Sequence, residues 1–244
     1  MDPFSLPPVA ALLEAAVTII LGLSDLLEPV AGHAAAAAAI ALLTLLVRIV
    51  LIPTGVAQAK AEQARTRLAP RLRELAERHR RDPERLQRET TRLYADAGTS
   101  PLAGCLPMLV QAPVVGVLYA VFLHATIGGH ANPLLAHELL GIPLGSNALH
   151  AVAGGDPGAI AVFGVLVLLI ALVAEVTRRV FRPVASPEGP GSSLARHVGF
   201  LQYVTAAVAV FVPLAAGVYL LTTTTWTLAQ RRVLRARYPL DGAR

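Results

Sequence analysis

Charged residues are scarce in this sequence of 244 residues. Asp, Glu, Lys and Arg together make up 15% of the chain, whereas 55% of its residues are hydrophobic. A soluble domain typically carries about a quarter charged residues. The composition therefore argues against an ordinary soluble domain and indicates a protein with several membrane-spanning segments.

Cysteine and the usual catalytic motifs are also missing or rare. The chain has one cysteine, Cys105, which excludes a disulfide within the chain. It contains no GxSxG, no HExxH and no glycine-rich phosphate loop, so we expect a protein that is not an enzyme. His130, His137, Glu138 and His150 lie in one loop, but their spacing matches no standard set of metal ligands. We expect no metal and no cofactor.

Basic residues are absent from three long parts of the chain, residues 1–47, 93–177 and 197–230. Apart from Arg48, they lie in three segments: eleven from Lys60 to Arg92, four from Arg178 to Arg196 and five from Arg231 to Arg244. The positive-inside rule predicts that these segments are cytoplasmic. The first residues, MDPFSLPP, lack the basic start of a secretory signal, so no cleaved signal is expected.

Hydropathy and charge together predict an all-α membrane protein, a bundle of five transmembrane helices with its N-terminus outside and its C-terminus cytoplasmic. The expected order is an outer amphipathic helix (1–31), span 1 (32–57), a cytoplasmic helical hairpin (58–101), span 2 (102–125), an outer loop (126–157), span 3 (158–177), a cytoplasmic loop (178–197), spans 4 and 5 (198–230) and a cytoplasmic tail (231–244). The region 198–230 is too long for one span and has basic flanks, so it must cross twice, with Pro213 as the hinge.

Local signals refine this outline. Val9–Leu27 is interrupted by Glu14, Thr18 and Asp25, which favours a helix lying in the outer interface; a true span is the alternative. Glu28-Pro29 and Gly32 are expected to break it. Asp82-Pro83 and Asp156-Pro157 are typical helix starts, and Glu175 is expected to pair with Arg178 and Arg179. The hairpin is open to two interpretations, a solvated connector or an arm that recruits a partner.

A few polar groups stand inside the apolar spans: Thr44, Arg48, Gln111, Gln202 and Tyr219, with Thr222 to Thr225 further along. Arg48 lies about 21 Å below the outer end of its span, in the inner half of the bilayer. A cation there without an acidic partner needs water, which indicates a hydrated cavity open to the cytoplasm. The alternative is a side chain that extends to the interface from the end of a helix.

The segment GTSPLAGCLPMLVQAP (Gly98 to Pro113) resembles the most characteristic segment of the YidC/Oxa/Alb family of membrane protein insertases. Around it, TLLVRIVLIP (Thr44 to Pro53) resembles the first core span of that family, and RETTRLYADAG (Arg88 to Gly98) resembles the end of its cytoplasmic hairpin. FVPLAAGVYLL (Phe211 to Leu221) is similar to the hinge between its last two spans. Thr99-Ser100 departs from the family, which usually has an Asn before the proline.

The resemblance implies a substrate-binding groove with Arg48 as its cation, Thr44 beside it, Gln111 as an amide and Tyr219 as an aromatic residue facing the substrate. Gln202 stands where the family often has a proline, and Pro107, Pro113 and Pro213 would be structural hinges. The implied function is an insertase and chaperone in the inner or plasma membrane, acting on nascent membrane proteins within the lipid bilayer. The ribosome and the Sec translocon are further expected partners, with no specific nucleic-acid sequence. The alternative is a small anion transporter or channel that uses Arg48.

Overall fold

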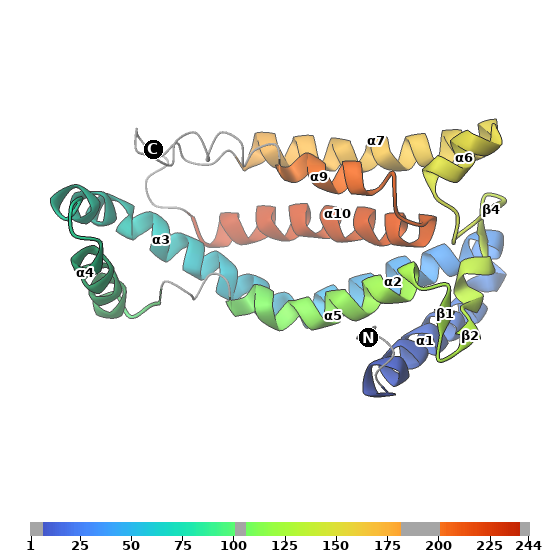
Figure 1. Cartoon of the computed structure of the whole chain (residues 1–244), viewed down its shortest axis with the longest axis horizontal. Helices are drawn as coiled ribbons and strands as arrows, with labels where there is room; N and C mark the ends of the chain where they lie inside the picture. Colours follow the sequence, from blue (N-terminus) through green and yellow to red (C-terminus); the bar gives the residue numbers. More distant parts are fainter. Residues whose placement is uncertain (1–6, 101–105, 182–200, 240–244) are drawn as a thin grey trace. The chain divides into compact units, whose positions relative to one another are not determined.

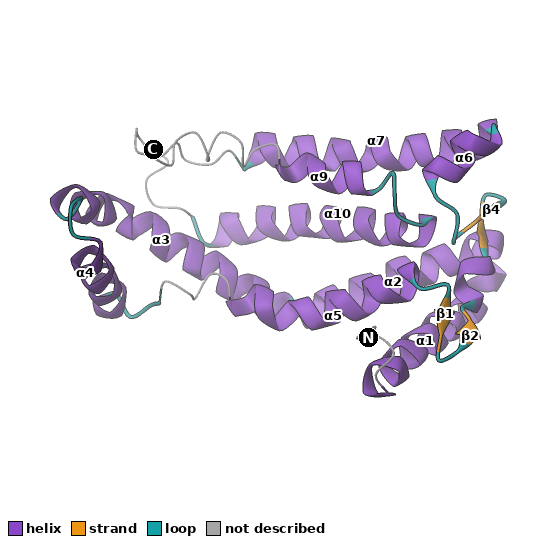
Figure 2. Cartoon of the chain, viewed as in Figure 1, coloured by secondary structure: helices purple, strands orange, loops and turns teal. Residues whose placement is uncertain are grey.

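The computed structural model describes residues 7–100, 106–181 and 201–239, and not the side chains of residues 7, 106–111, 113–115, 201 and 202. Cys105, most of the expected loop 178–197 and the end of the tail lie outside the described residues. The chain forms two compact units, the first of residues 1–48 and 114–228 and the second of residues 49–113 and 229–244. The chain is mostly helical, and its short strands lie in one connecting region (Figure 2).

The first unit contains most of the apolar helices. In chain order its elements are α1 (Pro7–Ala31), η2 (Gly32–Ala34), α2 (Ala35–Val50), the second half of α5 (Leu106–Leu123), α6 (Ala148–Gly154), α7 (Pro157–Val180), α9 (Leu201–Val208) and the first part of α10 (Leu214–Arg237). Two stretches, Pro8–Val50 and Pro157–Val180, are long and apolar enough to cross a membrane. The predominantly helical fold that the sequence predicts is therefore confirmed, and these two helices are consistent with a membrane protein.

Helix α1 presents three different faces along its length. Leu13, Val17, Ile20 and Ser24 are buried in the core. A second face exposes large apolar side chains, those of Leu12, Ile19, Leu26 and Val30. A third face exposes the polar side chains of Glu14, Thr18, Asp25 and Glu28. Helical periodicity at about 100° per residue separates these three sets. A helix of this kind suits a position where protein, lipid and water meet.

The break between α1 and α2 is at Gly32. The expectation that Glu28-Pro29 interrupts the helix is wrong, because α1 continues through Pro29 to Ala31. A proline in the last turn removes only one helical hydrogen bond. Gly32 has φ of +50°, which glycine adopts without steric penalty, and the chain resumes as α2 after the short η2 turn.

The predicted helix starts at two Asp-Pro pairs are confirmed. The Asp82 side chain accepts a hydrogen bond from the backbone N–H of Arg85. Asp156 accepts from the N–H groups of Gly158 and Ala159. Each aspartate thereby satisfies donors that the first turn of a helix leaves free.

A loop region joins α5 to α7 and contains two small antiparallel strand pairs, β1 (Thr126–Ile127) with β2 (His130–Ala131) and β3 (Glu138–Leu139) with β4 (Ile142–Pro143), and the turn η3 (Pro133–Ala136). This region is bonded to the helices beside it. The Asn132 side chain donates to the carbonyl oxygens of Val121 and His124 at the end of α5. The first N–H groups of α10, from Leu214 and Ala215, donate to the carbonyls of Ser146 and Leu144.

Helices α7 and α9 lie side by side (Figure 1). Glu175 on α7 forms the predicted pairs with Arg178 and Arg179, at 2.8 and 2.5 Å. It also accepts a hydrogen bond from the Tyr203 hydroxyl on α9. The Tyr203 contact was not predicted, and it ties the end of α7 to α9.

The second unit contains α3 (Ile52–Arg78), α4 (Pro83–Asp96), the first part of α5 and the end of α10. The chain between α2 and α3 leaves helical geometry at Leu51, and Pro53 stands in the first turn of α3. The region 32–57, expected as one span, is thus divided between α2 and α3. Helix α4 packs on α3 with Tyr94 buried.

Candidate functional site

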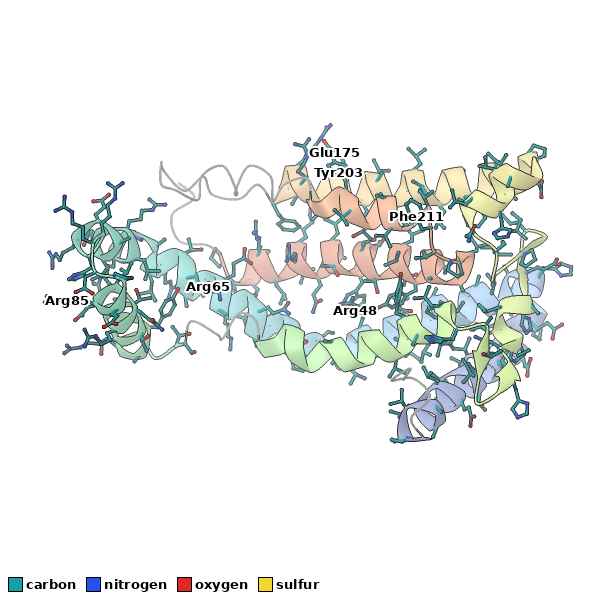
Figure 3. All side chains as sticks on the ribbon, in the orientation of Figure 1. Arg48, Arg65, Arg85, Glu175, Tyr203 and Phe211 are labelled. Carbon is teal, nitrogen blue, oxygen red and sulfur yellow. The ribbon has the colours of Figure 1, made fainter. Side chains whose placement is uncertain are left out.

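Arg48 lies in the last turn of α2 and extends toward α10 (Figure 3). Its side chain is half-buried and is close enough to Tyr219 for the two groups to interact electrostatically. Among the residues that the structure describes, no carboxylate lies within ion-pair distance of Arg48. The guanidinium keeps up to five N–H donors, so it can bind an anionic or polar group that approaches it.

Glu175 is the one carboxylate that the sequence suggests as a partner for Arg48. Its oxygens are already engaged by Arg178, Arg179 and Tyr203. Figure 3 shows Glu175 and Tyr203 together, on α7 and α9, apart from Arg48. Glu175 therefore belongs to the contact between α7 and α9 and does not pair with Arg48.

Thr44 lies one turn before Arg48 on the same face of α2. It is only 2% exposed, and its hydroxyl donates to the carbonyl oxygen of Ile40 at 2.7 Å. The donor of Thr44 is thus used within its own helix. Its oxygen retains the capacity to accept a hydrogen bond.

Tyr219 comes from α10 and is 3% exposed. Its ring packs against Phe122 of α5, with 5.9 Å between ring centroids and an angle of 44° between the planes. Tilted aromatic pairs of this kind are favourable and fix the ring. The packing holds the Tyr219 ring on the side of α10 where it interacts with Arg48.

Thr223 stands one turn after Tyr219 and was not singled out as a site residue. Its hydroxyl oxygen is buried, and its side chain lies within hydrogen-bonding reach of the Tyr219 hydroxyl. The neighbouring Thr222, Thr224 and Thr227 instead donate to carbonyls one turn earlier in α10. Thr223 therefore shares a polar face of α10 with Tyr219, and the spacing of four residues is the sequence signal that could have identified it.

The other expected site residues are placed only by their backbone. Gln111, Pro107 and Pro113 lie on α5, and Gln202 lies in the first turn of α9, but their side chains are outside the described set. Pro213 lies in the connection between α9 and α10. The structure therefore brings together Arg48, Thr44 and Tyr219 and leaves the roles of Gln111 and Gln202 as predictions.

Polar and apolar groups are distributed unequally along the first unit. Toward the β strands the core is dry, with Phe122, Leu134, Leu144 and Leu214 almost fully buried. Around Arg48 and along α10 after Tyr219, polar side chains are half-buried instead. A cation in such surroundings is stabilised by water or by an anion, so the Arg48 end of the unit is suited to a polar ligand.

Comparisons with known proteins agree with this picture of an apolar helical protein. The family model described as "60Kd inner membrane protein" matches residues 27–241. The chain is 29% identical over 222 residues to "Membrane protein insertase YidC" of Streptomyces avermitilis, an alignment covering 83% of this chain and 51% of the relative. It is 30% identical over 220 residues to "Inner membrane protein ALBINO3, chloroplastic" of Arabidopsis thaliana, covering 84% and 47%. The chain thus spans about half the length of these two relatives.

Proposed function

The chain belongs to the 60Kd inner membrane protein family, the family of YidC and ALBINO3, and from this membership we propose that it inserts nascent proteins into a membrane. The observation that carries the proposal is Arg48, a cation in the last turn of the apolar helix α2. Its side chain extends toward α10 (Figure 3), is close enough to Tyr219 to interact electrostatically and has no carboxylate partner among the described residues. A segment that must cross hydrocarbon carries polar groups whose desolvation is costly. A fixed cation in a hydrated recess lowers that cost, above all for acidic residues.

We propose that the groove lies within the first unit, along α2, the second half of α5 and the first part of α10, with Arg48, Thr44 and Tyr219 on its wall and Gln202 as a further polar group. Gln111 keeps the role that the family resemblance implies for it, as a prediction. The buried hydroxyl of Thr223 would accept a water molecule or a polar group of the client. In this scheme the recess opens to the cytoplasm, and the dry region near Leu134, Leu144 and Leu214 closes its other end. Apolar client segments leave sideways into lipid through the hydrophobic effect.

The proposed topology has five spans, an outer α1 and a cytoplasmic hairpin formed by α3 and α4. The three faces of α1 support its place at the outer interface, because its polar side chains follow one side of the helix along most of its length. A helix that crossed the bilayer would expose these carboxylates to hydrocarbon. The basic segments Lys60–Arg92 and Arg231–Arg244 support a cytoplasmic position for the hairpin and the C-terminus.

Labelling of α1 tests this topology. In a Cys105→Ser background, Asp25→Cys should react with a membrane-impermeant maleimide added from outside, because Asp25 lies on the polar face. Leu26→Cys is the matched control, since Leu26 is 72% exposed in the protein but lies on the face assigned to lipid. In liposomes, we expect Leu26→Cys to react at least about tenfold more slowly than Asp25→Cys. After transfer to a detergent with a short acyl chain, the two cysteines should react at similar rates. Equal labelling of both cysteines in liposomes would contradict an interfacial α1.

Reconstitution tests the function itself. Liposomes that contain the protein should insert a small one-span client with an acidic N-terminal tail, and protease added outside should measure the tail that has crossed. Empty liposomes are the control. Clients would reach the protein from the ribosome or beside the Sec translocon. Absence of insertion for every one- and two-span client offered would refute the proposal.

An anion transporter that uses Arg48 is the second candidate, favoured by the same guanidinium. Uptake of a labelled anion into the liposomes, lost in Arg48→Ala, would support it. The chain shows no internal repeat with paired broken helices, a common feature of transporters, so the insertase is the better supported of the two.

A further inference from the structure

The end of α10 packs on the first part of α3 within the second unit. We call residues 229–239 the C-terminal extension. In it, Arg235 Nη2 lies 2.7 Å from Glu62 Oε1 of α3. Beside this ion pair, Gln63 Nε2 donates to the carbonyl oxygen of Pro239 at 2.8 Å. Two polar contacts thus join the last residues of the described chain to one turn of α3.

Two further contacts extend this interface toward the start of α3. The Lys60 ammonium lies over the Tyr238 ring, 5.8 Å from its centroid, within the range of a cation–π interaction. Nearer the start of α3, the Gln230 side chain covers Gly55 so closely that a Cβ atom there would clash with its amide nitrogen. Residue numbers increase in the same direction along both segments, so the extension runs parallel to α3.

These contacts matter because α3 has few buried apolar residues within the described parts of the chain. The chain leaves helical geometry at Leu51, so α3 begins as a separate helix. Its buried residues are Ala61 and Leu68, which give little apolar area for packing. The C-terminal extension adds an ion pair, a hydrogen bond and a cation–π contact where apolar packing is thin.

We propose that the C-terminal extension is a clasp that positions α3 against the end of α10, and that Glu62 and Arg235 act in it as a pair. The idea rests on the proposed function, because α10 also carries Tyr219 of the groove. The clasp holds the start of the hairpin at the end of a groove helix. Residues 229–239 then serve this chain internally.

Charge reversal tests the pair. The variants are Glu62→Arg, Arg235→Glu and the double variant, each made in the full chain. Hydrogen exchange of the backbone amides in residues 231–238 reports whether the extension is docked. An exposed ion pair contributes little on its own, so each single variant should exchange about two- to fivefold faster. The double variant should return to within about twofold of the wild-type rate.

Matched controls make the same charge changes at positions outside the Glu62–Arg235 ion pair. Glu77→Arg lies further along α3 and Arg237→Glu lies in the extension; both positions are exposed, and neither change should alter exchange by more than about 1.5-fold. Unchanged exchange in both single variants, or additive acceleration in the double variant, would overturn the clasp.

Insertion by the same variants tests what the clasp does. We expect each single variant to insert a small client about two- to fivefold more slowly and the double variant to recover. Full insertion by single variants whose extension exchanges faster would overturn the positioning role. If the wild type inserts no client but the exchange pattern holds, the proposed function fails while the clasp stands.

Discussion

Replacement of Arg48 by alanine is expected to reduce insertion of a client with an acidic tail by at least about tenfold. A hydrogen bond to a charged group contributes about 1.5–3 kcal/mol, and each 1.4 kcal/mol corresponds to a factor of ten. Arg48 is half-buried and extends toward α10, so its loss removes the positive charge of the proposed groove. The measurement is protease protection of the tail after reconstitution.

The variant should still fold. No described carboxylate depends on Arg48 for charge compensation, so alanine leaves no buried anion unpaired. Stability should change by no more than about 0.5 kcal/mol, measured by thermal unfolding in detergent. A large loss of stability would show that Arg48 supports the fold and would remove the basis for a specific role in the groove.

Three controls separate a groove cation from a side chain that only reaches the interface. Arg48→Lys keeps the charge and should retain most of the insertion. A client whose tail is neutral should depend on Arg48 far less, because its tail carries no anion. Arg85→Ala removes an exposed arginine from α4 and should insert normally. If Arg48→Ala inserts the acidic client at the wild-type rate, Arg48 has no groove role.

The sequence predicted features that depend on neighbours in the chain. Asp82 and Asp156 cap helices because the donors lie two or three residues away, and Glu175 pairs with arginines three and four residues on. The break at Leu51 was missed, although Pro53 in a first helical turn is a recognisable signal. The apolar segment that precedes Pro53 carries a single charge, Arg48, and the sequence therefore predicts one continuous span.

Contacts between distant segments could not be predicted in this way. Arg235 and Glu62 are separated by 173 residues, and neither has a sequence signal that selects the other. The same holds for Tyr203 with Glu175. For the site, hydropathy alone identifies Arg48 as an unusual charge, whereas Tyr219 is suggested by the family resemblance. The packing of Tyr219 on Phe122 depends on how α5 and α10 meet.

Asn132 is the position where a substitution should most reduce stability. Its side chain is 6% exposed and makes three hydrogen bonds: its amide donates to Val121 O and His124 O, and its oxygen accepts from Leu134 N–H. Asn132→Ala would leave these buried backbone groups without partners, at about 1–3 kcal/mol for each unsatisfied group. We expect a loss of about 2–4 kcal/mol, measured by thermal unfolding in detergent.

The effect of Asn132→Ala should reach α10. The loop that Asn132 anchors also accepts hydrogen bonds from the first N–H groups of α10. Leu134 N–H bonds to Asn132, the carbonyl of Leu135 accepts from Gly145, and the carbonyls of Leu144 and Ser146 accept from α10. Loosening the loop should therefore speed hydrogen exchange at Leu214 and Ala215 before the rest of α10. Exchange confined to the loop itself would contradict this coupling.

Asn147 provides the matched control. It has the same side chain in the same loop region and accepts from the N–H of His150 as the cap of α6, but it is only half-buried. Asn147→Ala should cost about 1 kcal/mol, the usual value for a lost helix cap. Asn132→Asp should be at least as damaging as alanine, since it would bring a buried carboxylate against two carbonyl oxygens. Equal stability of the Asn132 and Asn147 alanine variants would show that the bonds to α5 contribute no more than an ordinary cap.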